Sequence, residues 1–138
     1  MGSKGNAWEN LVLDRLFGGT AINWPGTIYV GLWTATLDDT STGATAGECN
    51  YTNYARVAKA TGTANWTAAS GGTVYNEGAI SFPQAGGDQT GTVTDFALVT
   101  SSSGAGTILY YGALTASKVI QNGDTPSFAD GVLTISED

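Results

Sequence analysis

The chain has 138 residues, of which 5 are basic and 12 acidic, and it contains no histidine and a single cysteine. Because nucleic-acid binding needs clustered lysine and arginine, and zinc sites need several histidine or cysteine ligands, this composition disfavours both. Glycine and threonine fill 20 positions each, beside 4 Trp, 6 Tyr and 4 Phe, which predicts a β-rich globular chain with one domain over residues 1–138.

The N-terminal segment has the pattern of a short amphipathic helix over about residues 6–17. Apolar side chains recur at positions i, i+3, i+4 and i+8, which are Trp8, Leu11, Val12 and Leu16. Asn6 and Glu9 predict a capping box at the start, and Gly18-Gly19 predicts the end. Leu13 and Phe17 add apolar surface beside the stripe. We therefore expect the helix to pack, against its own domain or against a second subunit.

From residue 27 onward the apolar residues alternate with a period of two, which predicts strands. In residues 27–35, Val30 and Leu32 lie on one face, while Tyr29 and Trp33 lie on the other. This strand is therefore expected to be covered on both sides, by the core and by the helix or a neighbouring subunit. Further strands are expected over residues 54–61, 73–82, 92–100, 107–114, 118–121 and 132–135.

The alternation of apolar residues predicts which side chains share a face of each strand. Val74, Ile80 and Phe82 are in phase, and Phe96 and Leu98 lie opposite Val93, Ala97 and Val99. Asn122-Gly123 and Asp130-Gly131 are turn signals between strands. Seven or eight short strands without intervening helices predict an all-β fold, an antiparallel β-sandwich of which a jelly roll is one form.

Residues 38–53 form a predicted polar loop of unusual length, and such loops are often contact surfaces. Asp38, Asp39 and Glu48 lie in this loop without EF-hand spacing, so a Ca²⁺ site is the less favoured interpretation. Cys49 has no nearby histidine or basic residue to activate it, which predicts an unreactive thiol.

The sequence predicts no catalytic, cofactor-binding or metal site, and we expect no enzymatic activity. Glu77 and Asp95 lie in predicted strands, whereas the acidic residues of loops and turns are expected to stabilise the local backbone. A glycosidase would need two carboxylates facing one cleft and is the less favoured interpretation. The basic residues are scattered and no apolar stretch has membrane-spanning length, so we expect neither nucleic acid nor a membrane as partner.

The aromatic residues divide according to their neighbours in the sequence. Six are expected in the core, namely Trp8, Phe17, Tyr29, Phe82, Phe96 and Phe128. Four lie beside Pro, Asn, Thr or Gly and are expected to be more exposed, where they could stack on sugar rings or anchor a protein interface: Trp24, Tyr51, Tyr54 and Trp66. The residues predicted to contact a partner protein are Trp8, Leu11, Leu16, Trp24, Tyr29, Trp33, Tyr51 and Tyr54.

A series of segments between about residues 10 and 135 forms a recognisable order. They are LFGG, TIYVGLWTA, YARVA, NWTAASGGTVYNEGAISFP, GTVTDFAL, ILYYGALT and NGDTPSFADGVLTI. This order resembles a family of small virion proteins of tailed phages, whose members are labelled as tail-fibre, capsid decoration or structural proteins. The loop over residues 38–53 is the part that resembles the family least.

The resemblance implies a β-sandwich subunit that assembles symmetrically, as a homotrimer on the outside of a capsid. We expect a capsid decoration (cement) protein that binds the major capsid protein and itself without a cofactor. Its expected location is the virion and, during assembly, the host cytoplasm. The alternative is a tail-fibre or tail-tip component that binds a host receptor or carbohydrate, and a cell-wall hydrolase is a distant third.

Overall fold

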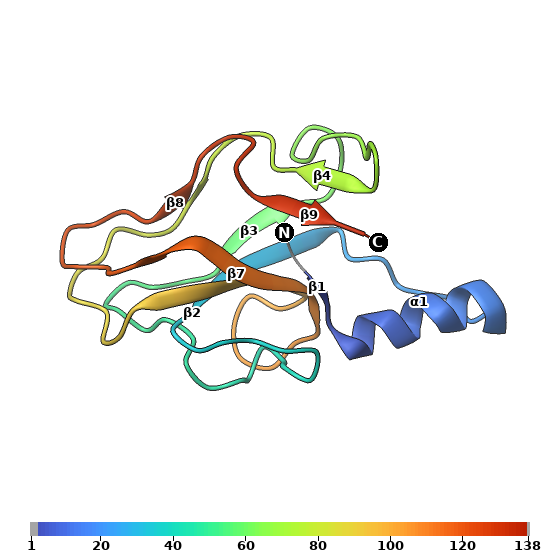
Figure 1. Cartoon of the computed structure of the whole chain (residues 1–138), viewed down its shortest axis with the longest axis horizontal. Coiled ribbons are helices and arrows are strands. Elements are labelled where there is room, and N and C mark those ends of the chain that lie inside the picture. Colours follow the sequence, from blue (N-terminus) through green and yellow to red (C-terminus); the bar gives the residue numbers. More distant parts are fainter. Residues whose placement is uncertain (1–2, 138) are drawn as a thin grey trace.

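Residues 3–137 are described by a computed structural model and form one helix and nine strands (Figure 1). In chain order these are β1 (Ser3–Lys4), α1 (Asn6–Gly18), β2 (Thr27–Trp33), β3 (Val57–Ala60), β4 (Thr73–Tyr75), β5 (Ile80–Ser81), β6 (Val93–Val99), β7 (Ile108–Lys118), β8 (Ser127–Phe128) and β9 (Thr134–Ser136). The predicted all-β class with one N-terminal helix is confirmed.

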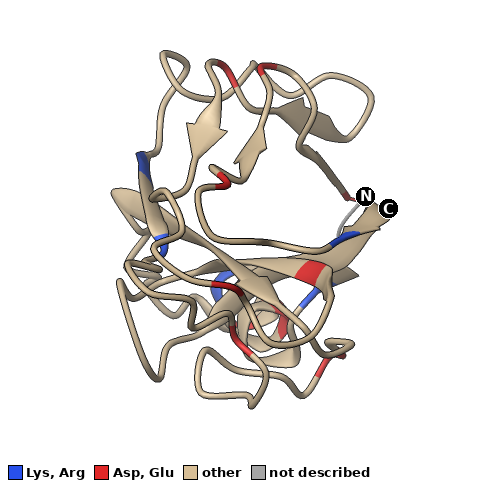
Figure 2. Ribbon diagram, turned by 90° about the vertical axis from the view of Figure 1, so that its left-hand side faces the viewer, with Lys and Arg blue, Asp and Glu red and all other residues tan. Residues whose placement is uncertain are grey.

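The strands form two layers. The larger is a five-stranded antiparallel sheet with the order β1-β7-β6-β2-β3. Two small antiparallel pairs, β4-β9 and β5-β8, make the second layer, and Figure 2 shows them across from the large sheet. A jelly roll would have two extensive sheets, whereas residues 3–137 form one large sheet and two short pairs.

The main core fills the space between the two layers. From the large sheet it takes Val30, Leu32, Phe96 and Leu98, and from the opposite layer Ile80, Phe82 and Ile135. A second cluster lies on the other face of the sheet, where Trp33, Leu37, Ala97, Val99 and Ile108 pack together. The prediction that residues 27–35 are covered on both sides is therefore confirmed. The expected cover by the helix is wrong, because on the second side Trp33 packs with Leu37 from the loop after β2 and with residues of β6 and β7. Cover by a neighbouring subunit stays a prediction.

Three predictions about strands are wrong in detail. The expected strand over residues 73–82 is split into β4 and β5, because Gly78 has a φ of 77° and the buried Asn76 side chain takes the place of the backbone in the pairing. Its Oδ1 accepts the Leu133 N–H, and its amide donates to the Gly78 and Ala129 carbonyls. Val93 packs with Phe96 and Leu98 instead of opposite them, because the pairing of β6 with β7 shifts register between Val93 and Asp95. Residues 118–121 form no separate strand, since β7 runs on to Lys118.

The start of α1 also differs from the prediction. Its N-cap is Gly5, with no side-chain cap, so the capping box of Asn6 and Glu9 is not formed. The reason is that Gly5 lies against β7, where a Cβ atom would be 2.6 Å from the Ile108 carbonyl oxygen. The end is as predicted, with Gly19 in the left-handed conformation at a φ of 70°.

Beyond its first turn, α1 extends away from the sheets (Figure 1). Trp8 is the helical residue that the fold buries, while Leu16 and Phe17 are 70% and 80% exposed. The prediction of Phe17 as a core residue is therefore wrong. Within this chain, the apolar stripe packs on the body of the protein at one end only.

Candidate functional site

The eight residues predicted to contact a partner fall into three groups. Trp8, Trp33 and Tyr51 are buried, Tyr29 and Tyr54 are half-buried, and Leu11, Leu16 and Trp24 are exposed. The exposed three belong to α1 and the segment after it, where the Trp24 ring stands edge-on to that of Trp8, 5.4 Å between centroids. A partner contact stays a prediction for these three residues.

The buried aromatic side chains are held by polar contacts as well as by packing. The Trp33 indole N–H donates to the Thr45 carbonyl at 3.0 Å, and the Tyr51 hydroxyl donates to the Pro83 carbonyl at 2.8 Å. Because Tyr51 and Trp66 are in the core, their predicted exposure is wrong. The missing information was the position of residues such as Pro83, 32 positions away, which no local pattern contains.

The loop over residues 38–53 is fastened to the body by Arg56. The Arg56 side chain is almost fully buried, and its Nε and Nη2 donate to the two Glu48 carboxylate oxygens at 2.7 and 2.8 Å. It also donates to the carbonyls of Gly43, Ser101 and Gly104 at 2.8, 2.9 and 3.0 Å, and to the Ser101 hydroxyl at 3.1 Å. The loop is thus an integral part of the fold, and the Glu48 carboxylate is occupied by a guanidinium.

Cys49 is 3% exposed. Burial, and then the neighbouring Glu48, raise the pKa of its thiol to about 12. A thiol with this pKa stays protonated at neutral pH, as expected of an unreactive cysteine.

Several acidic side chains stabilise turns, as predicted. Asp124 accepts the Gln121 backbone N–H at 2.9 Å, and Asp38 accepts that of Thr40 at 2.9 Å. Asp130 differs from the prediction, because it accepts the backbone N–H of Gly78, 52 positions away, at 2.9 Å. Residues 3–137 contain no cluster of three or more His, Cys, Asp or Glu side chains placed to hold a metal ion. No helix in the same range combines the length and apolar character needed to cross a membrane.

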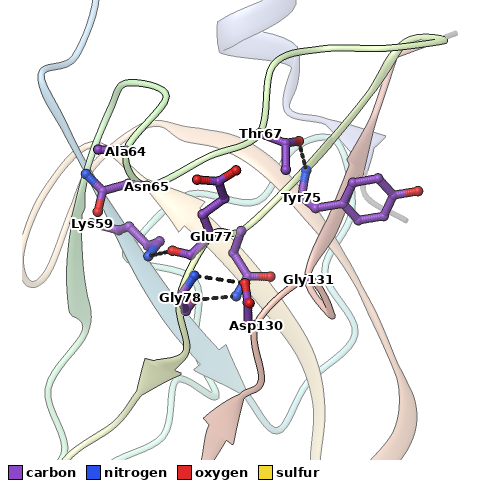
Figure 3. Close-up of a pocket in the computed structure, with 10 residues that line it drawn as sticks. Lys59, Ala64, Asn65, Thr67, Tyr75, Glu77, Gly78, Asp130 and Gly131 are labelled. Carbon is purple, nitrogen blue, oxygen red and sulfur yellow. Dashed lines mark hydrogen bonds between the residues drawn. The ribbon is translucent and has the colours of Figure 1, made fainter.

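One polar hollow of the surface is an open groove of about 880 Å³, which we call the Tyr75 groove (Figure 3). It lies where β3, the segment after it, β4 and the turn before β9 meet. Its lining consists of Lys59, Ala64, Asn65, Thr67, Tyr75, Asn76, Glu77, Gly78, Asp130 and Gly131. Glu77 was among the candidate carboxylates in the sequence, but Tyr75 was not a candidate. Since neighbouring side chains of a strand point to opposite faces, the inward-facing Val74 could have placed Tyr75 on the outer face.

The framework of the Tyr75 groove is held by hydrogen bonds, some of them drawn in Figure 3. The Lys59 ammonium donates to the Glu77 carbonyl at 2.6 Å, and Thr67 accepts the Tyr75 backbone N–H at 3.0 Å. Asn76 is fully buried, so its neighbours Tyr75 and Glu77 point outward. Tyr75 is 41% exposed, and among residues 3–137 the Glu77 carboxylate has no hydrogen-bond partner. The groove therefore offers one aromatic face and one free carboxylate to solvent.

The charged residues are spread around the molecule. Lys and Arg are dispersed over the ribbon, and acidic residues occur on both layers (Figure 2). Two ion pairs connect described residues, Arg56 with Glu48 and Lys4 with Glu137, each at 2.7 Å. The described residues therefore form no basic patch, which agrees with the composition.

Comparison with known proteins agrees with the sequence resemblance. Residues 3–136 match the model of the family Gp80, described as podophage GP4 fiber I protein gp80. No curated protein shows significant similarity to the chain. Because the match covers nearly all of its residues, the chain belongs to the podophage GP4 fiber I protein (Gp80) family and is a tailed-phage structural protein.

Proposed function

We propose that the chain is a non-enzymatic structural component of a podophage fibre. The observation that carries this proposal is the family match over residues 3–136, whose description is of a fibre protein and not of a shell protein. It favours the tail-fibre alternative over the capsid decoration function that we expected first. The surface features support a protein that works by contact, since the helix and the Tyr75 groove are both open to solvent.

The position of the protein on the virion tests this proposal. Antibodies against the purified chain, detected with gold particles in electron micrographs, should label the fibres of intact phage. Gold spread over the shell would instead support cement binding to the major capsid protein and would overturn the fibre proposal. Particles from which the fibres have been sheared off are the matched control and should lose the label.

We further propose that the Tyr75 groove is where such a fibre contacts carbohydrate of the host surface. A sugar ring presents an apolar C–H face together with hydroxyl groups. An exposed aromatic ring can cover the apolar C–H face. Free carboxylate and amide groups can form hydrogen bonds with the sugar hydroxyl groups. Tyr75, Glu77 and Asn65 all line the groove and supply these groups.

Retention of the purified protein on immobilised host polysaccharide tests the carbohydrate contact. Tyr75→Ala and Glu77→Ala should each weaken retention by about tenfold, which corresponds to the loss of one good contact. Trp24→Ala is the matched control, because Trp24 is an exposed aromatic residue outside the groove. Equal retention of all three variants and the wild type would show that the groove does not bind the polysaccharide.

A further inference from the structure

Two apolar surfaces without a partner lie toward opposite ends of the molecule. The first is the outer face of α1, formed by Leu13, Leu16 and Phe17, which we call the helix face. These side chains are 52%, 70% and 80% exposed. They follow at i, i+3 and i+4, so they lie together on one side of the helix. Figure 1 shows α1 projecting at one end of the long axis.

The second surface is an apolar groove of about 540 Å³, which we call the β8 groove. Its floor includes the buried side chains of Phe82 and Val93, and its rim includes Val119 and Val132, which are 64% and 61% exposed. The segment joining β7 to β8 borders it, and in Figure 1 this segment reaches the end of the molecule opposite α1. Exposed apolar side chains around a concave floor are typical of a protein-binding site.

We infer that the helix face of one copy docks into the β8 groove of the next copy. The shapes correspond, because a row of three large apolar side chains projects from one surface and a groove of matching character is hollowed in the other. The 13-residue helix is about 20 Å long. Since α1 is anchored at its first turn only, its outer turns are free to reach a neighbouring molecule.

The charges beside the two surfaces are complementary. Asp14 follows Leu13 on α1, and Lys118 lines the β8 groove. The groove lining also contains Asp124, whose carboxylate accepts the Gln121 backbone N–H at 2.9 Å. Asp14 and Lys118 are both exposed, and neither has an ion-pair partner among residues 3–137. Docking would bring one of the few free cations of this acidic protein toward a free carboxylate. A copy of the same chain therefore fits the groove in charge as well as in apolar character.

The contact joins different surfaces of the two copies, so each copy keeps one free helix face and one free groove. Such heterologous contacts continue into a ring or an open chain. This inference deepens the proposed fibre function, which it supplies with a repeating contact, and it rests on that function for its biological setting. The three side chains of the helix face offer on the order of 400 Å² of surface, compared with about 800 Å² per partner in a standard stable complex. We therefore expect reversible association.

Sedimentation velocity across a concentration series tests the inference. The wild type should show concentration-dependent species larger than the 14.1 kDa monomer at about 100 µM. Phe17→Asp, on the helix face, and Val132→Asp, on the groove rim, should each be monomeric at that concentration. Both positions are exposed, so the circular dichroism spectrum should be unchanged. Tyr75→Asp, outside both surfaces, is the control and should associate like the wild type.

Mixing the two monomeric variants gives the sharpest result. The Phe17→Asp copy keeps an intact groove and the Val132→Asp copy keeps an intact helix face, so the mixture should form a dimer and stop there. A wild type that stays monomeric, or a mixture that does not dimerise, would overturn the inference. The outcome is separate from the fibre proposal, because gold labelling of virions does not depend on association of the purified chain.

Discussion

Replacement of Arg56 by methionine should destabilise the fold strongly. Methionine keeps much of the apolar length of the side chain but removes the guanidinium, which holds Glu48 and three backbone carbonyls. Two of these carbonyls, at Gly43 and Gly104, belong to segments that the guanidinium ties together. The guanidinium also lies 5.6 Å above the Trp33 ring centroid, a contact that methionine replaces only in part.

The size of the expected loss in unfolding free energy follows from the burial of the Arg56–Glu48 ion pair. Removing one partner of a buried ion pair costs about 3–5 kcal/mol, because the remaining charge is left without compensation. The Glu48 side chain is 22% exposed and water can solvate it in part, so we expect the lower end, about 3 kcal/mol. For a chain of this size each kcal/mol lowers the Tm by roughly 3–4 °C, which gives a decrease of about 10 °C.

Urea unfolding followed by circular dichroism measures this change, and Arg15→Met is the matched control. Arg15 is exposed on α1 and loses the same charge, so its variant should stay within about 0.5 kcal/mol of the wild type. If Arg56→Met loses less than about 1 kcal/mol, or no more than the control, the view that Arg56 fastens the loop over residues 38–53 is refuted.

Three further predictions concern single side chains. Cys49, whose pKa is raised to about 12, should react with a disulfide reagent only after unfolding, and fast labelling of the native protein would contradict its burial. Burial alone would raise the pKa of Glu137, but the ammonium of Lys4 and a tyrosine hydroxyl lower it. The resulting stabilisation is present above the ordinary pKa of 4.5 and is lost as the pH falls through the lowered value. Denaturant titrations should therefore show Glu137→Gln less stable than the wild type at pH 7, with a difference that shrinks below about pH 4, and a constant difference would contradict the assignment. Gly5→Ala should cost about 1–3 kcal/mol in urea unfolding, since its Cβ would meet the Ile108 carbonyl, and an unchanged midpoint would show that the N-cap moves freely.

The fold class could be predicted from the sequence because its signals are local. Alternation places Val30 and Leu32 on one face of β2 and Trp33 on the other, and the two faces join different clusters. Glycine marks chain reversals for an equally local reason, as at Gly123 and Gly131, which have φ angles of 93° and 72°. Such features need only the residue and its neighbours.

Burial of polar and aromatic side chains outside the regular strands could not be predicted in this way. Tyr51 lies among polar residues in the sequence, yet its hydroxyl bonds to Pro83 and its ring is in the core. Arg56 resembles a surface cation until Glu48 and Ser101 are brought to it by the fold. These partners depend on tertiary pairing and leave no periodic trace.

The helix shows another limit of prediction from the sequence. Its apolar residues could be identified from their spacing, but the spacing does not specify what covers them. Trp8 is covered by its own chain, whereas Leu16 and Phe17 are not. The candidate site shows the same limit, because Tyr75 and Asp130 line one groove only when the segment before β9 folds beside β4.

We propose that this protein is a fibre component whose copies contact one another through α1. A cryo-electron microscopy reconstruction of the phage, with the chain fitted into density, tests it most directly. We expect copies to lie in the fibres, with Leu16 and Phe17 of one copy facing Val132 of its neighbour. Copies placed on the capsid shell, or fibre copies whose α1 points into solvent, would contradict it.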